Sequence, residues 1–362
     1  MKNTRDTKAV WCAFALVSAV AVTLGVTNAT AGQQSPGADS GRIGAAGRGW
    51  VAKAGRIGVT RDGGHSVSLL ATLPVTREQV ADVAVLPAAV QVATIGPSGL
   101  GVWASVDGGS KWSRLPVAAA SGQVGAAQFV QDRSGVVGLQ VTDTTSSNFS
   151  AGEWFTPRRD GTWDRHDVPA AGQVTSAGAA LWLAGGPQAS RLYRSVNNGT
   201  SWAATAATGC DLAGAAYAPP RENDSGALVL AVSAAGSASD VDLLSCMSAD
   251  RGSTWHTAAS IVVPQRLGPG TVVPSGVGGN SLWFVVPDAT KVVRVAGDGT
   301  VSTLSPNGLP TGVVSVSATS DSAALVTTST TSCRTNKGSC STVDGVFQTV
   351  DGGRTWKPVA AP

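Results

Sequence analysis

Short apolar runs recur along the chain, separated by polar, glycine-bearing turns. The clearest runs are WVAKA from Trp50, VQVATI from Val90, VVGLQV from Val136, LWLAGG from Leu181, LVLAVS from Leu228, LWFVV from Leu282 and ALVTT from Ala324. Each is followed, after a turn, by another apolar run such as LGVWASV or GVFQTV, and such pairs predict β-hairpins. A small-residue run such as VADVAVL usually precedes the hairpin, and a short run such as WSRLPV follows it. The pattern therefore predicts a repeated unit of strands A, B, C and D.

An eight-residue motif joins strands C and D of this unit. Its consensus, Ser/Thr-x-Asp/Asn-x-Gly-x-x-Trp, is met four times, by the segments that begin at Ser105, Ser195, Ser248 and Thr349. Three degraded copies begin at Thr60, Thr156 and Arg294. Successive Trp-slot positions are 45, 51, 39, 53, 46 and 55 residues apart, and they are Val67, Trp112, Trp163, Trp202, Trp255, Val301 and Trp356. One propeller blade per repeat has this length, so the sequence predicts an all-β protein, a single seven-bladed β-propeller of four-stranded antiparallel blades.

We expect a structural role for the residues of the motif. An Asp or Asn side chain accepts hydrogen bonds from nearby backbone N–H groups, and glycine relieves the positive φ angles of a tight turn. The tryptophan buries a large apolar face against the blade. The residues expected to act in this way are Asp62, Asp107, Asn197, Asp250, Asp351, Trp112, Trp202, Trp255 and Trp356.

The repeats resemble the Asp-box, or BNR, repeats of sialidase-like β-propellers, and they cover almost the whole chain after its first 31 residues. That superfamily includes sialidases, xyloglucan-cleaving glycosidases, sortilin-type receptors and a photosystem II assembly factor family. The resemblance implies a propeller whose boxes lie on the rim opposite the ligand face. Because one fold hosts many functions, the function still has to be argued from a site.

A sialidase-like site is not supported by the residues that such a site needs. The resemblance implies an arginine cluster that begins in an Arg-Ile-Pro motif, a tyrosine nucleophile late in the chain with an assisting glutamate, and an aspartate acid/base. The positions available are Arg42 and Arg56, both followed by Ile-Gly, the early tyrosines Tyr193 and Tyr217, and the glutamates Glu78, Glu153 and Glu222. The chain is therefore closer to the non-catalytic members, of the photosystem II assembly factor or sortilin type. We assign no catalytic residue, no metal site and no cofactor, because no phosphate loop, nucleophile elbow or ligand cluster is found.

The first 31 residues read as an export signal. Lys2, Arg5 and Lys8 precede an uncharged run over residues 9–26, and Ala29-Thr30-Ala31 offers a cleavage site. An uncleaved membrane anchor is the alternative reading, because about 18 apolar residues can span a bilayer.

The remaining chain divides into residues 32–41, expected to be a flexible lead-in, and residues 42–362, the propeller. Loss of residues 1–31 removes three basic residues and one acid, so the net charge changes from +3 to +1 (3 − 3 + 1). A nearly neutral surface argues against nucleic-acid binding, which needs a basic face. We expect a monomer that is secreted or held at the cell surface, with the Ala-, Gly- and Val-rich composition of a high-GC bacterium.

Four cysteines follow the signal, at positions 210, 246, 333 and 340. An even number in an exported chain suggests disulfides. Cys333 and Cys340 would close a short loop, and Cys210 and Cys246 would then pair by elimination, although four cysteines allow three connectivities. A zinc site is less favoured, because no histidine lies at ligand spacing from them.

The loops opposite the boxes are the expected binding surface, because variable loops on a rigid scaffold usually carry binding. Long stretches are expected at residues 142–153, 233–242, 328–344 and 258–271. The candidate binding residues are Asn148, Glu153, Arg334, Asn336 and Lys337. We expect a non-enzymatic propeller that binds an extracellular or cell-surface protein or glycan. The alternatives are a glycan-acting hydrolase and an assembly or stability factor for a membrane complex.

Overall fold

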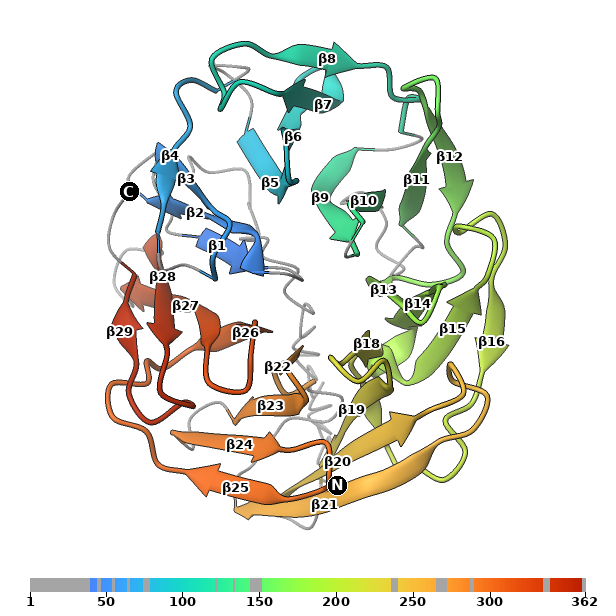
Figure 1. Cartoon of the computed structure of the whole chain (residues 1–362), viewed down its shortest axis with the longest axis vertical. Helices are drawn as coiled ribbons and strands as arrows, with labels where there is room; N and C mark the ends of the chain where they lie inside the picture. The colour runs from blue at the N-terminus through green and yellow to red at the C-terminus, as the bar shows by residue number, and fades with distance from the viewer. Residues whose placement is uncertain are drawn as a thin grey trace, which may run out of the picture.

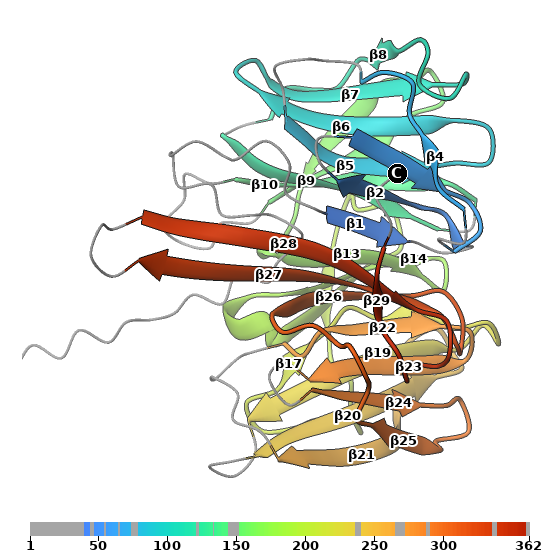
Figure 2. The same cartoon turned by 90° about the vertical axis from the view of Figure 1, so that its left-hand side faces the viewer.

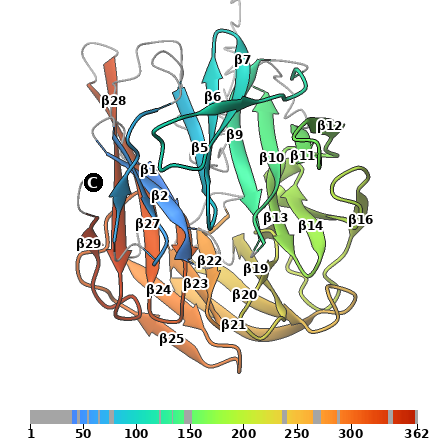
Figure 3. The same ribbon diagram turned by 45° about the horizontal axis from the view of Figure 1, so that its top comes forward.

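Seven antiparallel sheets are arranged side by side in a ring, as expected from the repeats (Figures 1 and 3). The computed structural model describes residues 40–43, 47–53, 56–63, 66–73, 79–120, 123–132, 134–143, 152–235, 240–264, 272–286, 290–334 and 339–359. Each sheet takes its strands from one continuous stretch of chain, and we number the sheets blade 1 to blade 7 in chain order.

The innermost strand of each blade lies nearest the centre of the ring, and the next strand in sequence pairs with it. The inner strands are β1 (Ser40–Ile43), β5 (Gln79–Val85), β9 (Val124–Gln131), β13 (Gly172–Ala177), β17 (Ala216–Tyr217) with β18 (Arg221–Glu222), β22 (Ser275–Gly278) and β26 (Val313–Ala318). The second strands are β2 (Gly49–Lys53), β6 (Val90–Gly96), β10 (Val136–Asp143), β14 (Ala180–Gly185), β19 (Leu228–Ala235), β23 (Ser281–Val286) and β27 (Ala324–Arg334). In blade 5 the inner strand is split, because Pro219 and Pro220 cannot donate to a ladder.

The third and fourth strands complete each blade toward the outside of the ring. The third strands are β3 (Arg56–Thr60), β7 (Gly99–Ser105), β11 (Glu153–Pro157), β15 (Arg191–Ser195), β20 (Asp240–Ser248), β24 (Lys291–Val295) and β28 (Ser339–Thr349). The outer strands are β4 (Ser68–Leu69), β8 (Ser113–Leu115), β12 (Trp163–Asp167), β16 (Ala203–Thr205), β21 (His256–Pro264), β25 (Val301–Leu304) and β29 (Lys357–Pro358). A short 3-10 helix, η2 (Pro187–Ala189), precedes β15.

The hydrophobic core lies between the blades and not within them. The seven buried clusters each join residues of two neighbouring blades. Successive residues of a strand point to opposite faces, so Leu282 and Phe284 of β23 pack toward blade 5 while Trp283 and Val285 pack toward blade 7. The second strands are therefore buried on both faces, which explains their largely apolar sequences.

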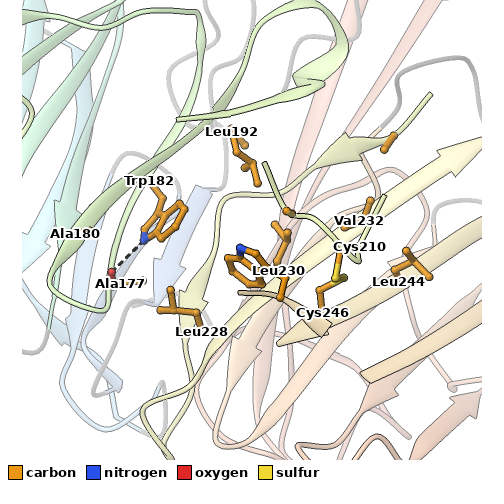
Figure 4. Packing of buried hydrophobic residues seen from close by; sticks show 14 residues of the cluster. Ala177, Ala180, Trp182, Leu192, Cys210, Leu228, Leu230, Val232, Leu244 and Cys246 are labelled. Carbon is orange, nitrogen blue, oxygen red and sulfur yellow. Dashed lines mark hydrogen bonds between the residues drawn. A yellow bond between two sulfur atoms is a disulfide. The ribbon is translucent and has the colours of Figure 1, made fainter. Parts of the chain in front are cut away.

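The cluster between blades 4 and 5 also contains a disulfide (Figure 4). Cys210 and Cys246 are bonded, with 6.1 Å between their Cα atoms, and both are fully buried. This is the pair expected by elimination. Cys246 occupies the third-strand position that holds Trp154 or Tyr193 in other blades, so the sulfur bridge fills a space that an aromatic ring fills elsewhere.

The four complete boxes form one repeated turn. In the box of blade 2, Ser105 Oγ donates to Asp107 Oδ1 at 2.9 Å, while Gly109 N donates to Ser105 Oγ and Lys111 N donates to Asp107 Oδ1, both at 2.9 Å. The same three bonds recur around Asn197, Asp250 and Asp351 at 2.7–3.0 Å. The copies in blades 3 and 6 fold differently, as tighter turns in which Asp160 and Asp298 accept from the backbone N–H two residues on.

The fifth residue of the box is a glycine for two reasons. Its φ is positive, at +84° to +89° in Gly109, Gly199, Gly252 and Gly353. It also lies against the preceding blade: a Cβ on Gly252 would be 2.3 Å from the ring of Trp182, and one on Gly199 would be 2.2 Å from Trp154. The box is thus an interlock between blades as well as a turn.

A methyl group at this glycine should lower the free energy of unfolding by more than backbone strain alone would. We expect Gly252→Ala to lower the free energy of unfolding by roughly 2–5 kcal/mol, the sum of left-handed strain and overpacking against Trp182. The matched control is Gly161→Ala, because Gly161 also has φ +85° but has open space around its Cβ position. That variant should lose only about 1–2 kcal/mol. Urea unfolding measures both, and equal losses would contradict the interlock.

The box carboxylates should make stability depend on acid pH. Hydrogen bonds from the Thr254 hydroxyl and N–H, and then from Ser248, lower the pKa of Asp250 to about 2. Because an unfolded Asp titrates near pH 4, this stabilisation is complete above about pH 4 and is lost as the pH falls through about 2. Thermal unfolding midpoints should therefore fall over that interval. Asp250→Asn, which copies the natural Asn197 box, should fold and lose part of this dependence, and an unchanged pH profile in that variant would refute the assignment.

Candidate functional site

The face opposite the boxes carries the turns between the second and third strands. The longest of these hairpins is β27–β28, which projects beyond the rest of the ring (Figure 2). The sequence predicts long loops here, whereas the structure continues the ladders: residues 328–334 pair with 339–345, and residues 233–235 pair with 241–243. Residues 258–264 likewise belong to the outer strand β21. Thr, Ser and Val favour a pleated ribbon, so these stretches extend strands instead of forming loops.

The candidate binding residues are distributed over two hairpins of this face. Arg334 ends β27, and Cys333 lies directly opposite Cys340 in the β27–β28 ladder. The side chains at the tip of this hairpin lie outside the described part of the structure, so a Cys333–Cys340 disulfide stays a prediction. Asn148, Asn336 and Lys337 also lie outside the described residues.

Glu153 is placed at the start of β11 and is buried, with 7% of its surface exposed. Arg165 Nη1 lies 3.4 Å from Glu153 Oε1. Asp167 is the direct cross-strand neighbour of Glu153 on β12 and is exposed. The three residues form a charged group at the loop-side end of blade 3, in which Glu153 is held by Arg165 instead of facing solvent freely.

An ion pair between the buried Asp82 and the partly buried Arg42 connects the inner strands of three blades. Arg42 Nη2 of β1 donates to Asp82 Oδ2 of β5 at 2.8 Å and to the carbonyl oxygen of Phe129 of β9 at 2.8 Å. Asp82 also accepts from Trp50 Nε1 and from the backbone N–H groups of Val83 and Phe129, each at 2.8 Å. Burial raises the pKa of Asp82, against the opposing effects of Arg42 and these donors. All four hydrogen bonds end on the carboxylate oxygens, so the Asp82 carboxylate is satisfied by protein groups.

Arg221 of β18 is a second cation near the centre of the ring. Burial, and then repulsion from Arg42, lowers the pKa of Arg221 to about 10. Among the described residues it has neither a hydrogen-bond acceptor nor a carboxylate partner for its side chain. It lines a hollow between blades 4, 5 and 6, together with Gln173, Ser275 and the apolar residues Val229 and Leu282.

The residues considered for a sialidase-like reaction are dispersed or engaged elsewhere. Arg42 is held by Asp82, and Arg56 is exposed on the third strand of blade 1. Tyr193 is buried in the cluster between blades 3 and 4. Tyr217 packs against the cluster between blades 4 and 5, and burial, followed by the charge of Asp211, raises its pKa, which is the wrong direction for a nucleophile.

No group of three His, Cys, Asp or Glu residues in the described ranges is placed to hold a metal ion. No helix within those ranges is long and apolar enough to cross a bilayer.

Seven four-stranded antiparallel blades around one axis define a seven-bladed β-propeller. No protein-family model matches the chain, and no curated protein matches it in sequence. Similar solved structures include a catalytically inactive virginiamycin B lyase from Staphylococcus aureus with quinupristin (12% identity, 83% of this chain and 94% of that chain, TM-score 0.50). They also include YCF48 from Cyanidioschyzon merolae (12%, 90% and 86%, TM-score 0.34) and the Aleuria aurantia lectin with a fucosylated sugar (15%, 74% and 94%, TM-score 0.41). These likenesses show the propeller fold alone.

Sequence reasoning did not identify the charged residues at the ring centre as a group. Asp82 stands in VADVAVL, an otherwise small and apolar strand, and that isolated acid is the one local signal. Arg42 and Asp82 are 40 residues apart in the chain, and no spacing rule joins them. Arg221 follows Pro219-Pro220, which marks a broken strand but not a cation site.

The Arg42–Asp82 pair should behave as a buried ion pair. We expect Asp82→Ala to cost about 3–5 kcal/mol of unfolding free energy, because it leaves the Arg42 charge uncompensated. Adding Arg42→Met should cost less than the sum of the single changes, since the orphaned cation is then removed. The control is Asp164→Ala in the exposed Arg158–Asp164 pair, which should cost at most about 1 kcal/mol. Additive losses at positions 42 and 82 in denaturant unfolding would argue against the pairing.

Proposed function

We propose that this chain is an exported, non-enzymatic propeller that binds a protein or glycan at or outside the cell surface, through the face opposite the Asp boxes. The observation that carries the proposal is the β27–β28 hairpin, whose strands of 11 residues project beyond that face (Figure 2). Within the described ranges, residues 330–334 and 339–345 pair only with each other, so neither edge of the hairpin is paired with another described strand. Such edges are suited to recognising an extended partner segment.

The residues of the Asp-box face are already used to hold the fold together. The Asp, Ser/Thr and Gly residues of the boxes are engaged in turn hydrogen bonds and in contacts with the neighbouring blade. A binding surface made of them would have to break the interlocks that hold the ring. Export and a monomeric state remain part of the proposal, and they rest on the N-terminal sequence and on the closed ring of blades.

A glycan hydrolase is the second candidate, because Glu153 and Asp167 are direct cross-strand neighbours. Two carboxyl groups roughly 5–10 Å apart can cleave a glycosidic bond. Against this, Glu153 is buried and bound by Arg165, and its β-sheet partner lies on an outer strand and not at the ring centre.

The binding face can be tested with two exposed valines. Val343 lies on the projecting hairpin and is 68% exposed, while Val106 lies in a box and is 83% exposed. A photo-crosslinking amino acid is placed at either position. If the partner is a surface protein, we expect crosslinks from position 343 and not from position 106. If the partner is a glycan, we expect retention on a glycan array that depends on the hairpin. Replacing residues 330–343 by Asn-Gly removes the crosslinking position, so this variant is read out by glycan-array retention or by pull-down of the crosslinked protein, both of which should be lost. Its thermal midpoint should not change, because Ser329 and Asp344 are directly opposite and a two-residue turn can join them.

The same protein should release no reporter from a panel of aryl glycosides. Release that disappears in Glu153→Gln or Asp167→Asn would replace the binding proposal by the hydrolase. Equal crosslinking from both valines, or unchanged glycan retention after the hairpin is shortened, would remove the loop face as the site.

A further inference from the structure

Arg221 is a charged group that the fold leaves without a protein partner. Its five N–H donors find no acceptor among the described residues, and the side chain is half-buried on the inner strand of blade 5. A desolvated cation is unfavourable unless it is paired, and proteins rarely bury Arg without a partner. The Asp82 carboxylate, which lies on the inner strand of blade 2, already accepts four hydrogen bonds, from Arg42, Trp50, Val83 and Phe129.

The surroundings of Arg221 favour an anion from outside the chain. Arg42 is close enough to repel Arg221, so two guanidinium groups share this region with the single Asp82 carboxylate. Arg42 uses one nitrogen, Nη2, for its bonds to Asp82 and to the Phe129 carbonyl. Arg221 lines the hollow between blades 4, 5 and 6 and has no acceptor among the described residues, so it is the residue placed to contact an anion there.

The hollow beside Arg221 limits the size and chemistry of that anion. Its cavity volume is about 20 Å³, and the surrounding empty space, open solvent included, is about 260 Å³. Gln173 of blade 4 and Ser275 of blade 6 line it with polar groups, and Val229 and Leu282 line it with apolar ones. A planar guanidinium matches a carboxylate through two parallel hydrogen bonds, and the amide and hydroxyl can donate to the same oxygens.

We propose that Arg221, with Gln173 and Ser275, forms a binding site for one carboxylate group that carries a small apolar body. The site is built from the inner strands of blades 4, 5 and 6, so it is distinct from the hairpin face and does not depend on the function proposed for that face. The carboxylate can belong to a sugar acid, to a peptide C-terminus or to a free small acid.

The test uses the full chain and sodium acetate as the probe. Isothermal titration at constant ionic strength against sodium chloride should show saturable acetate binding, and acetate should raise the thermal midpoint. Arg221→Gln, and Arg221→Lys, which keeps the charge but lacks the planar fork, should each weaken binding at least about tenfold. Arg191→Gln is the matched control, because Arg191 is exposed on β15 and should leave acetate binding unchanged.

A second readout separates a ligand site from a structural role. In acetate-free buffer, Arg221→Gln should keep or raise the thermal midpoint, because it removes a half-buried cation that has no partner among the described residues. A lower midpoint would overturn the proposal, since it would show that protein groups already satisfy this charge. Absence of saturable acetate binding, or equal binding of chloride or inorganic phosphate, would overturn it as well.

The source of the carboxylate follows from three further titrations. Glucuronate that binds more tightly than acetate would identify a sugar acid, and N-acetylglycine that binds more tightly would identify a peptide C-terminus. Weaker binding of both would assign the site to a free small carboxylate.

Discussion

Burial of every blade on both faces is the constraint on which this structure depends. Because side chains alternate along a strand, each second strand supplies two different inter-blade clusters at once, as Leu282 and Trp283 of β23 do. A blade removed from the ring would expose both of its faces, so the ring gains its stability as a whole. The box serves the same constraint, since its glycine gives the large ring of Trp182 or Trp154 a place against the neighbouring blade.

The interface between blades 1 and 7 has the least apolar packing among the described residues. No strand is exchanged across it among the described residues, and its buried cluster is the smallest, with Val51, Leu325, Val346 and Val359. On its other side, blade 1 is joined to blade 2 because Arg42 and Trp50 both donate to Asp82. Blade 3 joins them through Phe129, whose N–H donates to Asp82 and whose carbonyl accepts from Arg42. A buried ion pair adds little net stability compared with apolar packing, but its directed bonds fix how three inner strands sit relative to one another. The pair thus orients the blade that has the smaller apolar seam.

The fold could be predicted from the local sequence, because each local signal recurs from blade to blade. The box fixes the turn, the all-apolar second strand indicates burial on both faces, and Cys246 in an aromatic position indicates a bridge in place of a ring. The weak copies at Thr156 and Arg294 show the limit of this reasoning: they keep the Asp-Gly-Thr letters but close as tighter turns, because their Asp stands nearer the Thr. The extended β27–β28 ladder was missed for a related reason, since polar Thr and Ser residues pair as well in a projecting ribbon as they sit in a loop.

The charged residues at the ring centre could not be found from sequence, because contacts such as Arg42–Asp82 and the Arg42–Arg221 repulsion exist only after the ring closes. Their arrangement is nonetheless informative. The Ser/Thr and Asp/Asn side chains of the four complete boxes bond within their own turns, and Asp82 receives four hydrogen bonds although it is buried. The box indoles of Trp202 and Trp255, in contrast, are buried with no partner for Nε1 among the described residues. Arg221, on an inner strand, has no hydrogen-bond acceptor among the described residues, and Arg194 Nε and Arg294 Nε are likewise buried without a hydrogen-bond partner there. A local violation of that kind costs stability, and in natural proteins such costs are concentrated where a ligand compensates them. The polar groups of the boxes are therefore used to hold the blades together, and the Arg42–Asp82 pair orients three inner strands, whereas the Arg221 side chain on an inner strand has no acceptor among the described residues.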